Sequence, residues 1–272
     1  MTRRPPMPGT PGAGEDRTTL SPSTGAERSA SLPFRVRFDE ATPTGSLRTS
    51  VLLRYAADLA AFHSDLRGFG RAWYQERGLA WLVRGVELDV LGRVGYGQEL
   101  IGTTEAIAAR KVIARRRTEF RTTSGELTAT LTVDWALTSA GGAPTRIPPI
   151  FATVFTMPEQ TFAPIRVRSL PPDGVPIATL DLDVRPQELD PMGHVNNAVY
   201  ADWADQAIRA TGDAAGLAAL DAVPRRWRLE YLGAAGPEGR VRAIAWAAGD
   251  GWSCRIVDAR GGEPYLGASL EV

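Results

Sequence analysis

Apolar and polar residues alternate with a period of two along much of the chain, which is typical of β-strands with one buried face. Around residues 195–208 the apolar positions recur with a period near 3.6, which predicts a helix, and a second helix is expected over roughly 46–63. The expected strands are 34–39, 81–91, 97–109, 111–123 and 126–138 in the first half and 178–186, 225–233, 239–248, 252–259 and 264–271 in the second.

An internal repeat explains why the same order of elements is expected twice. At an offset of 148 positions, residues 40–47 pair with residues 188–195, and both segments carry a Pro-x-Gly turn. At an offset of 141, residues 91–95 pair with residues 232–236. Chance similarity is disfavoured because several matched positions are Pro, Gly or aromatic. Two copies of one unit, each a strand, a turn, a helix and an antiparallel meander, account for both offsets.

The second copy of the turn holds the candidate chemistry. Asp190 and His194 lie on it, and His194 is one of only two histidines in the chain. The first copy has Thr42 and Ser46 at the equivalent places. Because the turn is duplicated and the ionisable pair is not, we expect one active site per chain.

The string Asp190-x-Met192-Gly193-His194-Val195-Asn196-Asn197-x-x-Tyr200-x-x-Trp203 resembles the signature of hotdog-fold thioesterases. It is most similar to acyl-ACP thioesterases, which have two fused hotdog units within the 4-hydroxybenzoyl-CoA thioesterase-like superfamily. The resemblance implies an α+β fold of two tandem hotdog units, each an antiparallel sheet wrapped around a long helix. It also implies a cytoplasmic hydrolase that releases fatty acid from acyl carrier protein or coenzyme A.

Four segments are expected on this basis. Residues 1–32 are rich in Pro, Gly, Ser and Thr and should be a disordered tail. Residues 33–139 should form a non-catalytic hotdog unit, the proline-rich residues 140–176 an extended connector, and residues 177–272 the unit with the catalytic motif. Since two units in one chain mimic a dimer, a monomer or a homodimer is expected.

The expected mechanism uses a helix that begins near His194 or Val195. Its polarised N-terminus would present the amides of Gly193, His194 and Val195 to the thioester carbonyl. Asp190 would activate a water with help from His194, or would attack directly to form a mixed anhydride. Both routes stay open.

Our expectations for the residues near this turn are less specific. One of Asn196 and Asn197 should contact substrate and the other should support the helix. Tyr200 and Trp203 are favoured as helix core over acyl contacts, and the first helix should face the acyl chain.

The sequence departs from the plant-type pattern at three positions. Met192 stands where those enzymes have Asn, and Ala234 and Ala235 stand where they have an acidic residue beside a cysteine. Glu230 or Asp205 is a candidate substitute acid. These departures keep a second hypothesis open, a non-catalytic module that binds acyl thioesters.

Composition narrows the remaining functions. The formal net charge is zero and the pI is about 6.8, which disfavours nucleic acid as a partner. No apolar run is long enough to cross a membrane, and no metal or cofactor motif is present. We expect Cys254 to be a buried thiol and His63 to be a cation near the C-terminus of the first helix.

Overall fold

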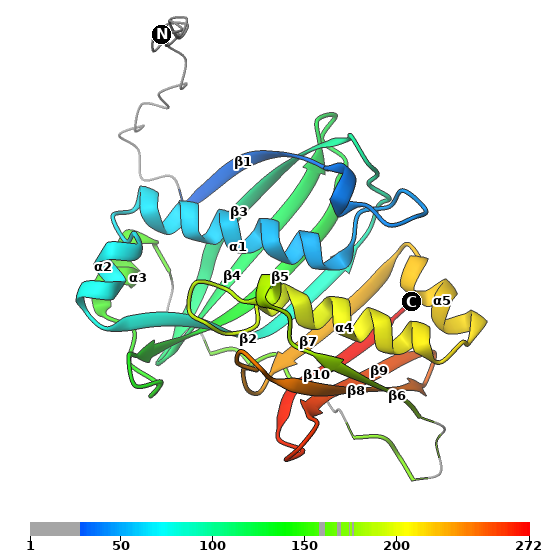
Figure 1. Ribbon diagram of the computed structural model, residues 1–272. Helices are drawn as coiled ribbons and strands as arrows, with labels where there is room; N and C mark the ends of the chain where they lie inside the picture. Colours follow the sequence, from blue (N-terminus) through cyan, green and yellow to red (C-terminus); the bar gives the residue numbers. More distant parts are fainter. Residues whose placement is uncertain (1–27, 158–160, 168–169, 174, 176) are drawn as a thin grey trace, which may run out of the picture.

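The computed structural model describes residues 28–157, 161–167, 170–173, 175 and 177–272. In these residues ten strands form one continuous antiparallel sheet, and the helices α1 and α4 lie side by side on one of its faces (Figure 1). The strands are β1 Ser29–Arg35, β2 Leu79–Val90, β3 Glu99–Arg110, β4 Ile113–Thr122, β5 Leu127–Ser139, β6 Ala178–Asp183, β7 Arg225–Tyr231, β8 Arg240–Ala248, β9 Gly251–Asp258 and β10 Pro264–Glu271. The helices are α1 Thr49–Leu66, α2 Arg71–Glu76, α3 Pro149–Val154, α4 Asn197–Ala210 and α5 Ala214–Asp221.

The strand order shows the internal repeat directly. Across the sheet it runs β1-β3-β4-β5-β2-β7-β10-β9-β8-β6, so each half mirrors the other around the pairing of β2 with β7. The first half-sheet curves around α1 and the second around α4 (Figure 1). The expected α+β fold of two tandem hotdog units is therefore confirmed.

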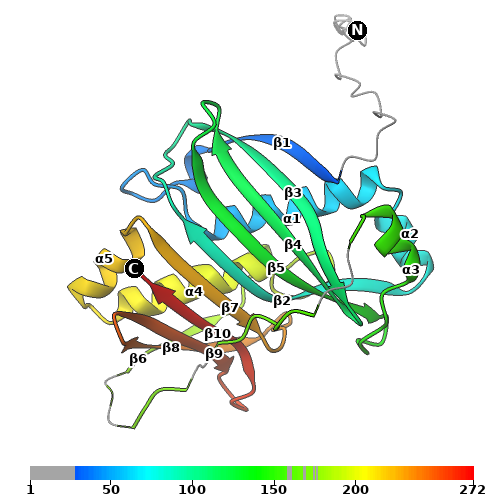
Figure 2. The same cartoon turned by 180° about the vertical axis from the view of Figure 1, so that it is seen from behind.

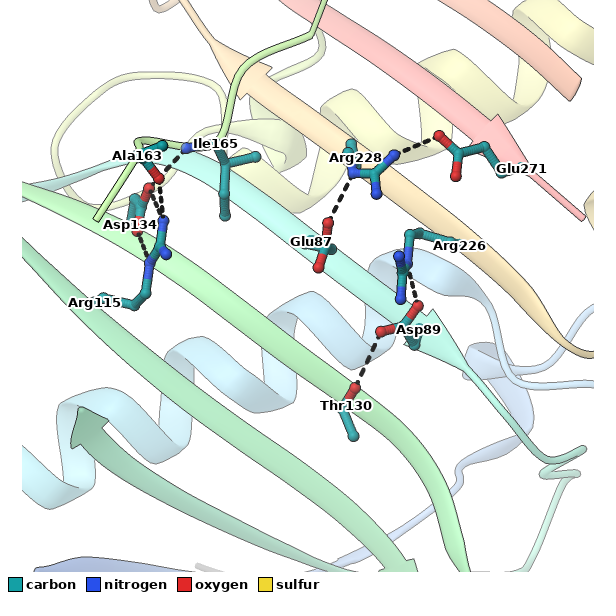
Figure 3. A network of polar contacts seen from close by, with 10 residues as sticks. All are labelled: Glu87, Asp89, Arg115, Thr130, Asp134, Ala163, Ile165, Arg226, Arg228 and Glu271. Atoms are coloured by element: carbon teal, nitrogen blue, oxygen red, sulfur yellow. Dashed lines mark hydrogen bonds and ion pairs between the residues drawn. The ribbon is translucent and has the colours of Figure 1, made fainter. Parts of the chain in front are cut away.

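Two ion pairs mark the axis that relates the copies. Arg54 of α1 contacts Asp202 of α4 at 3.2 Å. Glu87 of β2 contacts Arg228 of β7 at 2.7 Å, and Figure 3 shows this second pair. The partners of each pair are 148 and 141 positions apart, the two offsets of the repeat. Two residues at equivalent positions of the copies can touch only if both lie close to the two-fold axis that relates the copies. Because this axis passes between α1 and α4, the two helices run antiparallel.

Each long helix buries one stripe against its half-sheet. The buried positions of α1 include Val51, Tyr55 and Leu59, whereas those of α4 include Trp203 and Ile208. Burying one such side chain stabilises the folded state by about 1.5–3 kcal/mol, and the combined burial holds the helices on the sheet. Within the described ranges, no helix combines the length and apolar character needed to span a membrane.

The first strand starts earlier than expected. Residues 1–27 of the predicted tail lie outside the described residues, but residues 29–32 belong to β1 and pair with β3. The small polar residues of this segment gave no local signal, because its stability comes from pairing with a neighbouring strand. Conversely, residues 36–39 are not strand, and Phe38–Glu40 form a 3-10 turn instead.

The expected extended connector contains a helix. Helix α3 places Phe151 and Phe155 one turn apart, and both pack with Phe69 near α2 in a second hydrophobic cluster. The sequence carried a signal for it, since Pro148 and Pro149 precede apolar residues at helical spacing.

Residues 161–167 of the connector cross the outer face of the sheet where the two halves join (Figure 2). The amide of Ile165 donates to Asp134 of β5 at 2.9 Å, and the amide of Val167 donates to Glu230 of β7 at 2.9 Å. Gly85 of β2 permits this crossing, because an added Cβ would lie 2.8 Å from the Cβ of Ile165. The connector therefore ties both half-sheets together.

The seam between β2 and β7 yields a testable prediction. Glu87→Arg places two arginines opposite each other, and Arg228→Glu places two carboxylates there, so each change should lower the free energy of unfolding by about 1 kcal/mol. The exchanged pair Glu87→Arg with Arg228→Glu should recover only part of that loss, because Arg228 also pairs with Glu271, which the exchange leaves beside a second carboxylate. Urea unfolding of the four proteins measures the coupling. Strictly additive losses in the double variant would show that the pair does not interact.

Candidate active site

The turn before α4 is built by its own backbone and by Asp190. The amide of Asp190 donates to the carbonyl of His194 at 2.8 Å, and the amide of Gly193 donates to the carbonyl of Asp190 at 2.9 Å. Gly193 has φ +79°, a left-handed conformation that glycine adopts without strain. Oδ1 of Asp190 accepts the amides of Met192 at 2.8 Å and His194 at 3.3 Å.

The equivalent turn before α1 has the same geometry without ionisable groups. The amide of Thr42 donates to the carbonyl of Ser46 at 2.7 Å, and Gly45 has φ +82°. The Thr42 hydroxyl takes the place of the carboxylate, since it accepts the amide of Ser46 at 3.2 Å. Holding this turn therefore requires neither a carboxylate nor an imidazole.

Helix α4 begins later than expected, which changes the set of free amides. It starts at Asn197, and the Asn196 side chain caps it by accepting the amide of Ala198 at 3.0 Å. Residues 194–196 are not helical because Val195 bridges to Leu189 in antiparallel fashion and the Asn196 amide donates to Glu188.

The three amides expected to hold the carbonyl all have acceptors within the described structure, so none of them is free for a thioester carbonyl. Gly193 and His194 donate within the turn, and Val195 donates to the carbonyl of Ala235 at 2.9 Å. The Val195 side chain is also buried. By contrast, the amide of Asn197 has no acceptor among the described residues, as is usual at the first position of a helix.

The reactive side chains are accessible. Asp190 is half-buried and His194 is exposed. Within the described part of the chain, neither Oδ2 of Asp190 nor the imidazole of His194 has a hydrogen-bond partner. A free carboxylate oxygen, a free imidazole and a free helix N-terminal amide therefore occur within eight consecutive residues.

The two candidate substitute acids have other roles. Glu230 is buried on the outer face of β7, where it pairs with Arg166 and accepts the amide of Val167. Side chains alternate between faces along a strand, so Glu230 points away from the helices. Asp205 pairs with Arg209 on α4 at 2.5 Å.

Several structural expectations are confirmed. Tyr200 and Trp203 are buried in the core, and the Tyr200 hydroxyl accepts the amide of Ala235 at 2.8 Å. Cys254 is fully buried, and burial raises the pKa of its thiol to about 12.

His63 is not the cation near the helix C-terminus that was expected. It is buried, and burial together with the charges of Arg116 and Arg67 lowers its pKa from 6.5 to about 3. Its Nδ1 accepts a hydrogen bond from Nη1 of Arg116 at 2.8 Å. The ring is therefore neutral. Position at a helix end suggested a cation, but burial of the ring, together with the charge of Arg116 from 53 positions away, keeps it neutral.

Two hollows flank the helix pair. A cavity of about 540 Å³ lies between the C-terminal half of α1, α2, α3 and strands β4 and β5. A cleft of about 640 Å³ lies on the other side, between the Thr42–Ser46 turn and α4. Asp205 lines this second cleft, near the Thr42–Ser46 turn, which carries no ionisable side chain. No set of three or more His, Cys, Asp or Glu side chains in the described ranges is arranged to hold a metal ion.

The neutral His63 predicts a pH effect on stability. As the pH falls from about 6.5 towards 3, the imidazole of His63 binds a proton in the unfolded chain but not in the folded chain. The folded state therefore loses stability across that window. His63→Asn keeps a hydrogen-bond acceptor for Arg116 and removes the titration. Its free energy of unfolding should decline less steeply below pH 6.5 than that of the wild type, as measured by urea unfolding at several pH values. His194→Asn, which changes the exposed histidine, is the control. If His63→Asn were as steep as the wild type, the buried neutral histidine would be refuted.

Comparison with known proteins gives one family match, over the first half of the chain. Residues 29–141 match the family described as acyl-ACP thioesterase N-terminal domain. The match covers the first hotdog unit and does not reach Asp190 or His194. No curated protein matches the chain.

Solved structures show the same fold over most of the chain. A putative oleoyl thioesterase from Lactobacillus plantarum is 20% identical with a TM-score of 0.76, over 89% of this chain and 95% of that one. The 12:0-ACP thioesterase from Umbellularia californica is 18% identical with a TM-score of 0.74, over 90% and 97%. An acyl-ACP thioesterase from Bacteroides thetaiotaomicron VPI-5482 is 14% identical with a TM-score of 0.74, over 90% and 97%. The identities are low, so these likenesses establish the fold, whereas the match over residues 29–141 shows that the first hotdog unit is similar to the N-terminal domain of acyl-ACP thioesterases.

Proposed function

We propose that this protein hydrolyses a fatty acyl thioester, carried by acyl carrier protein or by coenzyme A, at the turn that precedes α4. The observation that carries the proposal is the comparison of the two turns. They share backbone geometry, and only the second places a carboxylate and an imidazole on it. A side chain that the fold does not need at that place is best explained by chemistry.

Asp190 acts as a general base in the proposed reaction. Two amides hold its Oδ1, which orients the carboxylate, and Oδ2 remains free to take a proton from water. That water attacks the thioester carbon. His194, exposed on the same turn, positions the water or passes the proton to the departing thiolate.

The amide of Asn197 stabilises the negative charge that develops on the carbonyl oxygen. It lies at the positive end of α4 and has no acceptor among the described residues. A single such donor contributes about 3–4 kcal/mol in other enzymes. Asn197 thus takes the substrate-contact role that the sequence left between it and Asn196, whose side chain caps the helix.

The internal symmetry indicates where the acyl chain lies. In the cleft of about 640 Å³, Asp205, Gln206 and Arg209 of α4 share a surface with Thr42 and Ser46. Their equivalents 148 positions earlier, residues 57, 58 and 61 of α1, should face Asp190 and His194 in the same way. These α1 residues line the cavity of about 540 Å³, which is within the usual size of ligand pockets. We place the acyl chain there.

The carrier is assigned from the family match. The matched domain is that of acyl-ACP thioesterases, which favours acyl carrier protein over coenzyme A and a role in cytoplasmic fatty acid synthesis. Purified protein should release thiol faster from acyl carrier protein than from coenzyme A bearing the same acyl group. The reverse order would assign the activity to coenzyme A thioesters.

One observation favours the non-catalytic alternative. Ala234 and Ala235 occupy the places of an acidic residue and its neighbour in plant-type relatives, and neither supplies a reactive group. A module that only binds acyl thioesters would bind acyl-coenzyme A tightly and release no thiol from any substrate.

Asp190→Asn is the principal test. The Asn oxygen can still accept the amides of Met192 and His194, so the turn should survive, but it cannot remove a proton from water. We expect kcat/KM to fall by about 10²- to 10⁴-fold. Thr42→Asn makes the matched change in the first turn and should leave turnover unchanged. Circular dichroism and the melting temperature verify folding of both variants. Undiminished thiol release by a folded Asp190→Asn protein would defeat the assignment.

Isotope incorporation tests for a mixed anhydride that water opens at the aspartyl carbon. In a single turnover in H₂¹⁸O, general-base catalysis places ¹⁸O in the released fatty acid and none in the enzyme. A mixed anhydride that opens at the aspartyl carbon would instead label the peptide containing Asp190. Mass spectrometry of product and peptide reads both sites, and label in that peptide would replace the proposed route with the covalent one.

A further inference from the structure

The cavity beside α1 contains a buried positive charge that no carboxylate of the described residues neutralises. Arg116 of β4 is 8% exposed and lines this cavity. In the described part of the chain, no Asp or Glu oxygen lies within 4 Å of its guanidinium, and its one hydrogen bond is to His63. A guanidinium has five N–H donors, so most of them are left for another acceptor.

The neighbouring arginine shows how this fold satisfies such a group. Arg115 donates to both carboxylate oxygens of Asp134, at 2.7 and 2.9 Å, and to the carbonyl of Ala163 at 2.9 Å (Figure 3). The two adjacent residues of β4 therefore differ. Arg115 is paired with other groups of the protein, whereas Arg116 faces the cavity.

His63 holds Arg116 in place without cancelling its charge. The ring is neutral, so it accepts the hydrogen bond from Nη1 and carries no negative charge. Burial lowers the pKa of Arg116 only to about 10, and the side chain remains protonated at neutral pH. Burying a charge without a counterion is costly, which is the situation that a bound anion relieves.

The remaining walls of the cavity suit a hydrocarbon. They are formed mainly by apolar and aromatic side chains, which include Trp81, Trp135, Phe151, Phe155 and Met157. Of the other charged residues on the wall, Asp58, Asp65 and Arg71 are exposed, and Arg115 is already paired with Asp134. A singly charged ligand fits best, because a second negative charge would find no partner on this wall among the described residues.

We propose that the cavity binds a linear hydrocarbon chain that bears a carboxylate, with the carboxylate on Arg116. Nη1 is engaged by His63, and the opposite edge of the guanidinium, formed by Nε and Nη2, can donate to both oxygens of a carboxylate. Two sources share this chemistry: a free fatty acid, or an acyl thioester whose far end is carboxylated. The second source rests on the proposed function, and the first does not.

Binding of decanoate tests the site without any reaction. By calorimetry, the wild-type protein should bind decanoate at least about ten times more tightly than decan-1-ol. Arg116→Met should abolish this preference. Arg71→Met, which removes an exposed arginine from the rim of the same cavity, should retain it. No preference in the wild type, or a preference that persists in folded Arg116→Met protein, would overturn the proposal.

A second measurement uses only the wild type and so does not depend on the folding of a variant. With [1-¹³C]decanoate, carbon NMR follows the ionisation of the bound acid. A carboxylate beside Arg116 should stay ionised to lower pH than the free acid, because a nearby positive charge lowers its pKa. A bound acid that titrates at or above the free value would contradict the site.

Kinetics then distinguish the two sources. If the ligand is the end of a substrate, the coenzyme A monothioester of the ten-carbon dicarboxylic acid should be hydrolysed with higher kcat/KM than decanoyl-coenzyme A, and Arg116→Met should remove that advantage. If it is a free fatty acid, decanoate should inhibit the wild type more strongly than Arg116→Met. A protein that binds decanoate as described but releases no thiol would refute the proposed hydrolysis and keep the carboxylate site.

Discussion

The pairing of β2 with β7 is the constraint on which the rest of the structure depends. It joins two half-sheets into one, sets α1 and α4 antiparallel beside each other, and so places the turn before each helix against the opposite copy. In a symmetric dimer, a residue on the axis would meet its own copy and repel it if charged. Here the equivalent positions hold opposite charges, Arg54 with Asp202 and Glu87 with Arg228. A single chain can stabilise the axis in a way that identical subunits cannot.

Because the two copies need not be identical, they can also have different roles. Both turns keep the glycine with positive φ and the same backbone hydrogen bonds, and only one has gained Asp190 and His194. The first copy instead encloses a cavity with α2 and α3, where the second copy has α5. In our account the second copy supplies the reacting groups and the first receives the chain of the substrate.

Regular features were accessible from the sequence because they depend on local patterns. The ten strands, both long helices and the matching turns follow from periodicity and from repeated Pro and Gly residues. Features that depend on distant partners were not. Edge pairing created the start of β1, the bond from Val195 to Ala235 occupied one of the amides expected to hold the carbonyl, and burial beside Arg116 made His63 neutral. The same reason applies to the oxyanion donor, since which amide is free depends on the loop that follows β7.

The central claim is that the start of α4, and not the equivalent start of α1, receives the thioester carbonyl. A crystal structure with an acyl-pantetheine amide, in which nitrogen replaces the scissile sulfur, tests it most directly. The account predicts the carbonyl oxygen within hydrogen-bonding distance of the Asn197 amide, Oδ2 of Asp190 separated from the carbonyl carbon by one water molecule, and the alkyl chain along residues 57–61 of α1. An analogue seated instead at Thr42 and Ser46, or with its carbonyl remote from Asn197, would contradict it.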